Sequence, residues 1–75
     1  MSLLSQAIIA ERYGLRLTLD QLAQALGMAK NTIYNQVSAG TFPVPTYLDG
    51  NKRFADYRDV ATYLDSCRAR AATLA

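Results

Sequence analysis

Residues 19–40 read LDQLAQALGMAKNTIYNQVSAG and carry the clearest structural signals in the chain. Apolar residues recur in the first half at helical spacing, which predicts an amphipathic helix. They are Leu19, Leu22, Ala23 and Leu26. Thr18 precedes this segment and Gln21 follows three positions later, which is typical of a capping box at a helix start. Gly27 is expected to end the helix, because glycine adopts a left-handed conformation at little cost.

A second helix is expected from about Lys30 to Ala39, ending at Gly40. Ile33 and Val37 share one side of it, and four polar or aromatic residues face elsewhere: Lys30, Asn31, Tyr34 and Asn35. Two short helices joined by a turn with glycine match the helix-turn-helix unit, whose second helix enters the DNA major groove. Similar helix pairs also occur in small helical domains that bind no nucleic acid. The pattern alone leaves both interpretations open.

A β-hairpin is expected after the helix pair. Pro43 and Pro45 cannot lie inside a helix and indicate an extended connector. Residues 46–48 and 52–54 are short strand candidates, separated by Asp-Gly-Asn at 49–51, a strong hairpin-turn signal. A hairpin directly after a recognition helix would be a wing, with these residues at its tip: Asn51, Lys52 and Arg53. The alternative is a solvated hairpin whose cations only maintain solubility.

Helices are also expected at both ends of the chain. Residues 2–13 have an apolar side and should pack on the body, with a dimer contact as the alternative, and residues 15–17 should be extended. Asp56 is expected to cap a final helix to about Arg70, followed by a frayed tail at 71–75. The inward stripe of this helix would be Tyr57, Val60, Ala61, Leu64 and Cys67. Arg68 and Arg70 would lie in its last turn, where the helix dipole favours cations.

Composition limits the function classes. The chain has 75 residues, 51% of them hydrophobic, and a net charge of +2, which fits one small domain. With one cysteine and no histidine, an intrachain disulfide, zinc sites of the Cys/His type and histidine-based catalytic systems are excluded. We expect no catalytic residue, no metal and no cofactor. We also expect a cytoplasmic protein without a membrane partner, because no apolar run could span a bilayer and no basic leader is present.

The order of helix, turn, helix, hairpin and helix resembles a known family over residues 18–66. It is similar to the winged helix-turn-helix domains of the MerR superfamily, in the minimal phage and plasmid branch with AlpA-type regulators and excisionases, also called recombination directionality factors. The residues that carry the resemblance are LA at 22–23, GM at 27–28, TIY at 32–34, GTFPVP at 40–45 and DVATYL at 59–64. The segment IIAERYG at 8–14 also resembles the start of pyocin-activator proteins.

Three positions depart from the family pattern. Ala29 stands where Ser or Thr commonly caps the recognition helix, which costs about 1 kcal/mol of helix stability. Gln36 occupies a position that is usually apolar. The family's tryptophan beyond the wing is absent, and Phe54 is expected to fill that core site.

The expected fold is therefore mainly α with a small β-hairpin, a winged helix-turn-helix formed by one domain of residues 1–75. Its parts are an N-terminal extension at 1–17, the helix-turn-helix at 18–40, the wing at 45–54 and the C-terminal helix at 56–70. The resemblance implies sequence-specific binding of double-stranded DNA by a phage or mobile-element protein, as a transcription regulator or an excisionase-like directionality factor. The alternative is a protein-interaction module that uses the helix-turn-helix only as a scaffold.

The residues expected to contact DNA are Lys30, Asn31, Thr32, Tyr34, Asn35, Gln36, Asn51, Lys52, Arg53 and Arg58. The amides of Asn35 and Gln36 suit the edge of adenine, and Lys30 suits guanine. Lys52 and Arg53 would bind the backbone or the adjacent minor groove, with a further phosphate contact from the residue at 58. Tyr34 would contact a sugar or phosphate, or else brace the wing.

The expected partners follow from the small number of cations. Acidic residues are absent from Gln21 through Leu48, but this stretch contains only one basic residue, a lysine. A monomer should therefore bind DNA weakly, so a dimer or a cooperative array along DNA is expected. The resemblance implies an integrase or RNA polymerase as a protein partner, and a nucleoid location in a prokaryote or phage-infected cell.

Overall fold

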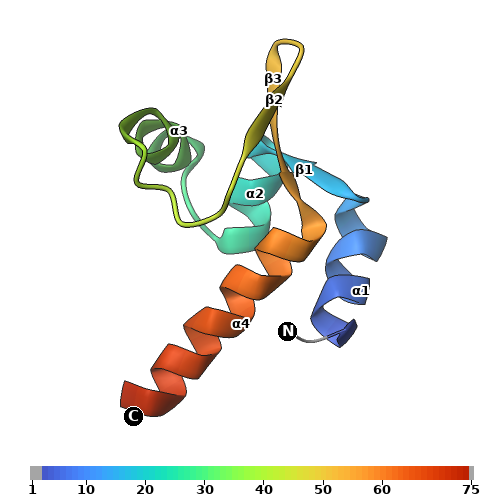
Figure 1. Cartoon of the computed structure of the whole chain (residues 1–75), viewed down its shortest axis with the longest axis vertical. Coiled ribbons are helices and arrows are strands. Elements are labelled where there is room, and N and C mark those ends of the chain that lie inside the picture. Colours follow the sequence, from blue (N-terminus) through green and yellow to red (C-terminus); the bar gives the residue numbers. More distant parts are fainter. Residues whose placement is uncertain (1–2, 75) are drawn as a thin grey trace.

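Four helices and a three-stranded antiparallel sheet make up the part of the chain that this computed structural model describes, residues 3–74 (Figure 1). In chain order they are α1 (Leu3–Tyr13), β1 (Arg16–Thr18), α2 (Leu19–Leu26), α3 (Lys30–Ala39), β2 (Tyr47–Asp49), β3 (Lys52–Asp56) and α4 (Tyr57–Leu74). The expectation of a helix-rich fold with a hairpin is confirmed. Within residues 3–74, no helix has the length and apolar character needed to cross a membrane.

Local capping explains the helix pair α2–α3. The Thr18 hydroxyl accepts a hydrogen bond from the Gln21 backbone N–H at 3.2 Å, and the Gln21 side chain accepts one from the Thr18 N–H at 3.0 Å. Gly27 ends α2 with a φ of +66°, as expected for a left-handed cap. Helix α3 has the expected bounds, and Ala29 makes no side-chain cap bond. The predicted capping box, turn and uncapped second helix are all confirmed.

The sheet contains one strand more than the hairpin expected from the sequence. Segment β1 pairs antiparallel with β3, which places Leu17 opposite Ala55. We expected only an extended lead at 15–17, because a three-residue strand has no readable alternation and its partner lies far along the chain. The β2–β3 hairpin is confirmed, with Gly50 and Asn51 as a two-residue turn. Gly50 has a φ of +64°, and no non-glycine residue among the described residues, Asn51 included, has a positive φ, which matches a type II′ turn.

The core lies between the sheet, α2, α3 and α4. Its fully buried side chains come from every one of these elements and from the connector after α3. They include Leu17, Leu22, Ile33, Val44, Ala55 and Val60. The expected inward stripe of α4 is confirmed, since Val60 and Ala61 are buried and Tyr57, Leu64 and Cys67 are half-buried. Val44 anchors the connector between its two prolines, and so fixes where the hairpin starts relative to α3.

Phe54 does not fill the core site that we assigned to it. Successive residues of a strand point to opposite faces, and Ala55 is the β3 residue that faces the core. Phe54 lies on the outer face instead, with the Arg16 guanidinium 3.9 Å from its ring centroid and the Tyr47 ring at 6.3 Å. The alternation of β3, fixed by pairing with β1, explains the error.

Helix α4 is longer than expected. The Asp56 carboxylate accepts a hydrogen bond from the Arg58 N–H at 2.8 Å, which confirms the predicted cap. The helix continues to Leu74, so the expected end near Arg70 and the frayed tail over 71–74 are wrong, and residue 75 lies outside the described residues. Alanine, arginine and leucine are strong helix formers, which explains the extension. Arg68 and Arg70 therefore lie before the last turn, which contains no basic residue.

Helix α1 packs beside α4 with only one of its apolar sides. Ile9 is buried, Tyr13 is half-buried, and the Ser5 hydroxyl donates to the Asp65 carboxylate at 3.0 Å. Leu4 and Ile8 remain 70% and 55% exposed, so the expectation that the apolar side packs as core is wrong for these two residues. Residues 8 and 9 point in directions about 100° apart on a helix, and the body covers the side of α1 that carries Ile9.

Candidate nucleic-acid interface

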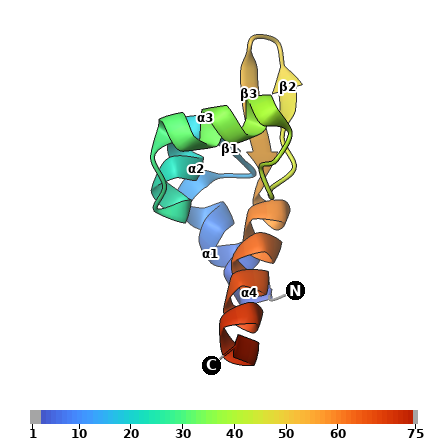
Figure 2. The same ribbon diagram turned by 90° about the vertical axis from the view of Figure 1, so that its left-hand side faces the viewer.

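Two adjoining hollows, of about 480 and about 300 Å³, lie between α3 and the β2–β3 hairpin. They share Leu19, Asn51 and Arg53, and together we call them the α3–hairpin groove. Its other lining residues are Thr18, Asp20, Lys30, Tyr34, Val37, Ser38, Leu48 and Lys52. Figure 2 shows α3 running across the upper part of the body beside the hairpin, while α4 extends away from both.

Helix spacing explains which α3 residues reach the groove. Lys30, Tyr34 and Ser38 are four residues apart and therefore share one side of the helix. Ile33 points into the core and is fully buried, which fixes the rotation of α3 about its axis. Tyr34 is 61% exposed, so it faces the groove without being packed against the hairpin.

Lys30 lies at the edge of the groove next to an acidic residue. Its ammonium nitrogen is 2.9 Å from the Asp20 carboxylate, and both side chains are mostly exposed. Exposed ion pairs contribute little free energy, so Lys30 can exchange Asp20 for another anion. Residues 21–48 contain no acidic side chain, but the fold brings Asp20, just outside this stretch, to the groove beside Lys30. The sequence did place Asp20 in the first turn of α2, where the helix dipole favours acidic residues, but it did not indicate that Lys30 lies beside it.

The two cations of the hairpin differ in their surroundings. Arg53 is half-buried and donates a hydrogen bond to the Thr46 hydroxyl at 2.9 Å. Lys52 is exposed and forms no ion pair with any residue among 3–74. Lys52 is therefore the freer of the two to bind an external anion. Asn51 stands beside them in the turn and completes the tip that we expected.

The other α3 candidates lie outside the groove. Asn31, Thr32 and Asn35 are exposed on α3 but do not line either hollow. Gln36 is half-buried, and its backbone carbonyl accepts hydrogen bonds from the N–H and the hydroxyl of Thr41. The structure thus brings Lys30 and Tyr34 to the hairpin tip, and it does not bring these four residues there.

Arg58 is engaged elsewhere. Its guanidinium donates two hydrogen bonds to the Asp56 carboxylate, both at 3.0 Å. These bonds hold the pKa of Asp56 below its ordinary value and raise the pKa of Arg58. Arg58 lines neither hollow of the groove. Arg58 therefore lies apart from the groove, and the phosphate contact that we assigned to it stays a prediction.

Arg16 connects the hairpin to β1, and our sequence analysis did not predict this role. Its Nη1 lies 2.6 Å from the Asp49 carboxylate, and its guanidinium stacks on Phe54. The hydrogen bond that Arg16 donates to Asp49, followed by its hydrogen bond with Tyr47, raises the pKa of Arg16. Arg16 pairs in register with Asp56 and Asp49 pairs with Lys52, so Arg16 reaches Asp49 diagonally across β3, a contact that no local pattern predicts.

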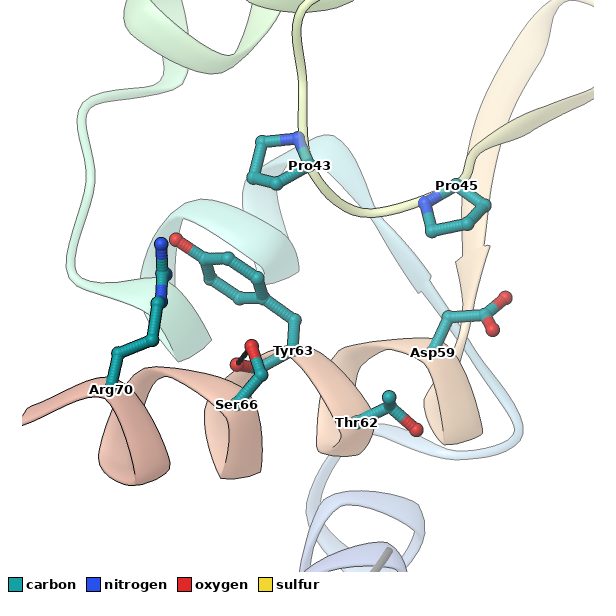
Figure 3. Close-up of a pocket in the computed structure, with 7 residues that line it drawn as sticks. All are labelled: Pro43, Pro45, Asp59, Thr62, Tyr63, Ser66 and Arg70. Carbon is teal, nitrogen blue, oxygen red and sulfur yellow. Dashed lines mark hydrogen bonds between the residues drawn. The ribbon is translucent and has the colours of Figure 1, made fainter. Parts of the chain in front are cut away.

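Another hollow, of about 480 Å³, lies between the connector and α4 (Figure 3). It is lined by Pro43, Pro45, Asp59, Thr62, Tyr63, Ser66 and Arg70. Ser66 donates its hydroxyl proton to the Tyr63 carbonyl at 2.9 Å, and Arg70 contacts the Cys67 sulfur at 3.5 Å. Contact with Cys67, followed by burial, raises the pKa of the Tyr63 hydroxyl. These polar groups interact with other residues of α4, whereas the α3–hairpin groove carries a cluster of cations. We therefore place the candidate site at the α3–hairpin groove.

Comparison with known proteins gives no match. No protein-family model, no curated protein and no solved structure is similar to this chain. Membership of the MerR superfamily therefore stays a prediction from the sequence motifs.

Proposed function

We propose that this chain is a winged helix-turn-helix protein that binds double-stranded DNA sequence-specifically, with α3 in the major groove and the hairpin against the neighbouring backbone. One observation carries the proposal. Helix α3 and the hairpin stand side by side and gather Lys30, Lys52 and Arg53 at one groove, with Asp20 as its one acidic lining residue. Three cations on a shared surface favour a phosphate backbone over a neutral partner.

The start of α3 supports a phosphate contact. Ala29 provides no side-chain acceptor, so the first backbone N–H groups of α3 lack an intrahelical or capping partner. Unpaired N–H groups at a helix start bind phosphate oxygens well. Lys30 would leave Asp20 for a phosphate or a guanine edge at the same end of the helix.

Base reading would come from the exposed side of α3. Asn31 and Asn35 are exposed, four residues apart, and carry amides that can form paired hydrogen bonds with adenine. Tyr34 and the hairpin tip would then contact the sugar-phosphate backbone on the groove side. This division separates base readout from backbone positioning.

At the biological level, we propose a transcription regulator or an excisionase-like directionality factor of a phage or mobile element, acting in the cytoplasm without a cofactor or an enzymatic activity of its own. The motifs TIY at 32–34 and GTFPVP at 40–45 support this branch. An integrase or RNA polymerase would be the protein partner. Bending of bound DNA beside an integrase attachment site would distinguish the directionality factor from the regulator.

The test is binding to a tiled set of duplexes from the neighbourhood of the gene. Tight binding to one tile, lost in a Lys30→Ala/Lys52→Ala/Arg53→Ala variant that remains folded by circular dichroism, is the expected result. Equal and weak binding of every tile would overturn the proposal. It would then favour the alternative, a protein-interaction module in which the helix-turn-helix is a scaffold only.

A further inference from the structure

Asp20 brings a negative charge into the cation-lined α3–hairpin groove. It lies in the first turn of α2, directly after β1, and lines the same hollow as Lys30, Asn51 and Lys52. Its carboxylate oxygen Oδ1 is 2.9 Å from the Lys30 ammonium nitrogen, and its side chain is 74% exposed. A hydrogen-bond acceptor and a donor are therefore presented side by side to a molecule that occupies the groove.

Three arrangements are open to Asp20 when a duplex lies in the groove. If it kept Lys30, the proposed interface would lose one of its three cations to an internal pair. If Lys30 left and Asp20 faced a phosphate, two negative charges would repel each other. In the third arrangement, Lys30 binds DNA and the Asp20 carboxylate accepts a hydrogen bond from a base edge. Only this arrangement gives both charged groups a favourable contact with the duplex.

We propose that Asp20 is a specificity-determining residue that accepts a hydrogen bond from the amino group of a cytosine in the major groove. This inference rests on the proposed DNA binding and names a base that the groove would select. The amino group of adenine lies between two acceptors, its own N7 and O4 of the paired thymine, which would repel the second carboxylate oxygen. The amino group of cytosine has an acceptor on one side only, O6 of the paired guanine, and that atom suits the Lys30 ammonium.

This contact would make Asp20 selective, because its cost and its gain fall on different duplexes. Every duplex brings phosphates toward the groove and meets the same repulsion from the carboxylate. A duplex with cytosine at the matching position offsets this repulsion with a hydrogen bond. Specificity is often built from one favourable contact and one element that repels other partners. Asp20 would supply both.

The test uses the duplex tile that the wild-type chain binds best, with each cytosine replaced in turn by N4-methylcytosine. This base keeps its pairing with guanine, but a methyl group replaces the N–H that faces the major groove. At one position the replacement should weaken wild-type binding about tenfold. Asp20→Ala should bind the original and the replaced duplex equally well, and it should bind the other tiles more tightly than the wild type does. Circular dichroism should confirm that this variant is folded.

Asp59→Ala is the matched control for the lost charge. Asp59 also lies in the first turn of a helix, α4, and it lines the hollow beside the connector instead of the groove. This variant should keep the wild-type sensitivity to the replaced cytosine.

Two results would overturn the inference while the wild-type chain still selects one tile, so that the proposed function stands. One is a wild-type chain that is insensitive to every replacement. The other is an Asp20→Ala variant that keeps all the wild-type sensitivities, because Asp20 would then act by charge alone. Equal and weak binding of every tile by the wild-type chain would overturn both the proposed function and this inference.

Discussion

Arg16 shows how one side chain can orient a β-hairpin. It reaches from β1 to Asp49 beside the hairpin turn, and on the way it covers the Phe54 ring. All three residues of β2 are exposed, so this strand has few contacts other than its ladder with β3. An exposed ion pair is weak alone, but here it acts together with a cation–π contact. Arg16 is therefore a positioning residue for the hairpin.

Replacing Asp49 tests this role, because the expected change in DNA affinity is opposite in sign to the change that the lost charge alone would cause. Asp49→Ala removes a negative charge near the proposed DNA contact, which by charge alone would tighten binding. We expect about fivefold weaker binding instead, or about 1 kcal/mol, because the hairpin loses its connection to Arg16. Amide hydrogen exchange at Gly50 and Asn51 should become faster without DNA. Tighter DNA binding with unchanged exchange would contradict the role.

The Asp56–Arg58 pair predicts a pH dependence of stability. Arg58 holds the pKa of Asp56 below its ordinary value in the folded chain. A lowered folded pKa means that the stabilisation is complete above the unfolded pKa and is lost as pH falls through the folded pKa. Urea unfolding at a series of acidic pH values should show a smaller loss of stability for Asp56→Asn than for the wild type. Parallel acid profiles would contradict this assignment.

At the level of elements, local chemistry predicted the helices and their caps better than the sheet. The Thr18 capping box and the left-handed glycine at 27 act within a few residues, so their patterns were readable. The pairing of Leu17 with Ala55 depends on residues far apart in the chain, and no local period signals it. Without this β1–β3 pairing, the sequence could predict neither the contacts of Arg16 nor the position of Phe54 on the outer face of the sheet. The second apolar side of α1 was also unreadable, because a spacing pattern does not say which side a neighbour covers.

The uncapped start of α3 gives a stability prediction. Ala29 has an extended conformation, with φ −69° and ψ 141°, which suits a capping residue. Ala29→Ser should therefore stabilise the fold by about 1 kcal/mol, and Thr18→Ala at α2 should destabilise it by a similar amount. Urea denaturation measures both. A Ser variant no more stable than the wild type would show that the α3 start is already satisfied.

Across the whole molecule, the surfaces with distinct chemistry are separate. The α3–hairpin groove carries the clustered cations, Leu3, Leu4 and Ile8 form an exposed apolar side of α1, and Arg68 and Arg70 lie on the distal part of α4. The sequence analysis grouped Lys30, Lys52, Arg53 and Arg58 as DNA contacts, and the fold brings the first three to the groove while Arg58 lies outside it. It could not identify Asp20 as a neighbour of Lys30, or Asp56 as the partner that occupies Arg58. Those contacts depend on side-chain positions in three dimensions.

The most direct test of groove binding compares the salt dependence of duplex affinity in two charge-matched variants. Lys30→Ala/Lys52→Ala removes the two most exposed groove cations, and Arg68→Ala/Arg70→Ala removes two cations from distal α4. If the groove contacts the DNA backbone, the slope of log affinity against log salt should fall by about two in the first variant and stay unchanged in the second. Equal losses of slope in both variants would mean that only overall charge attracts DNA, and would contradict recognition through α3 and the hairpin.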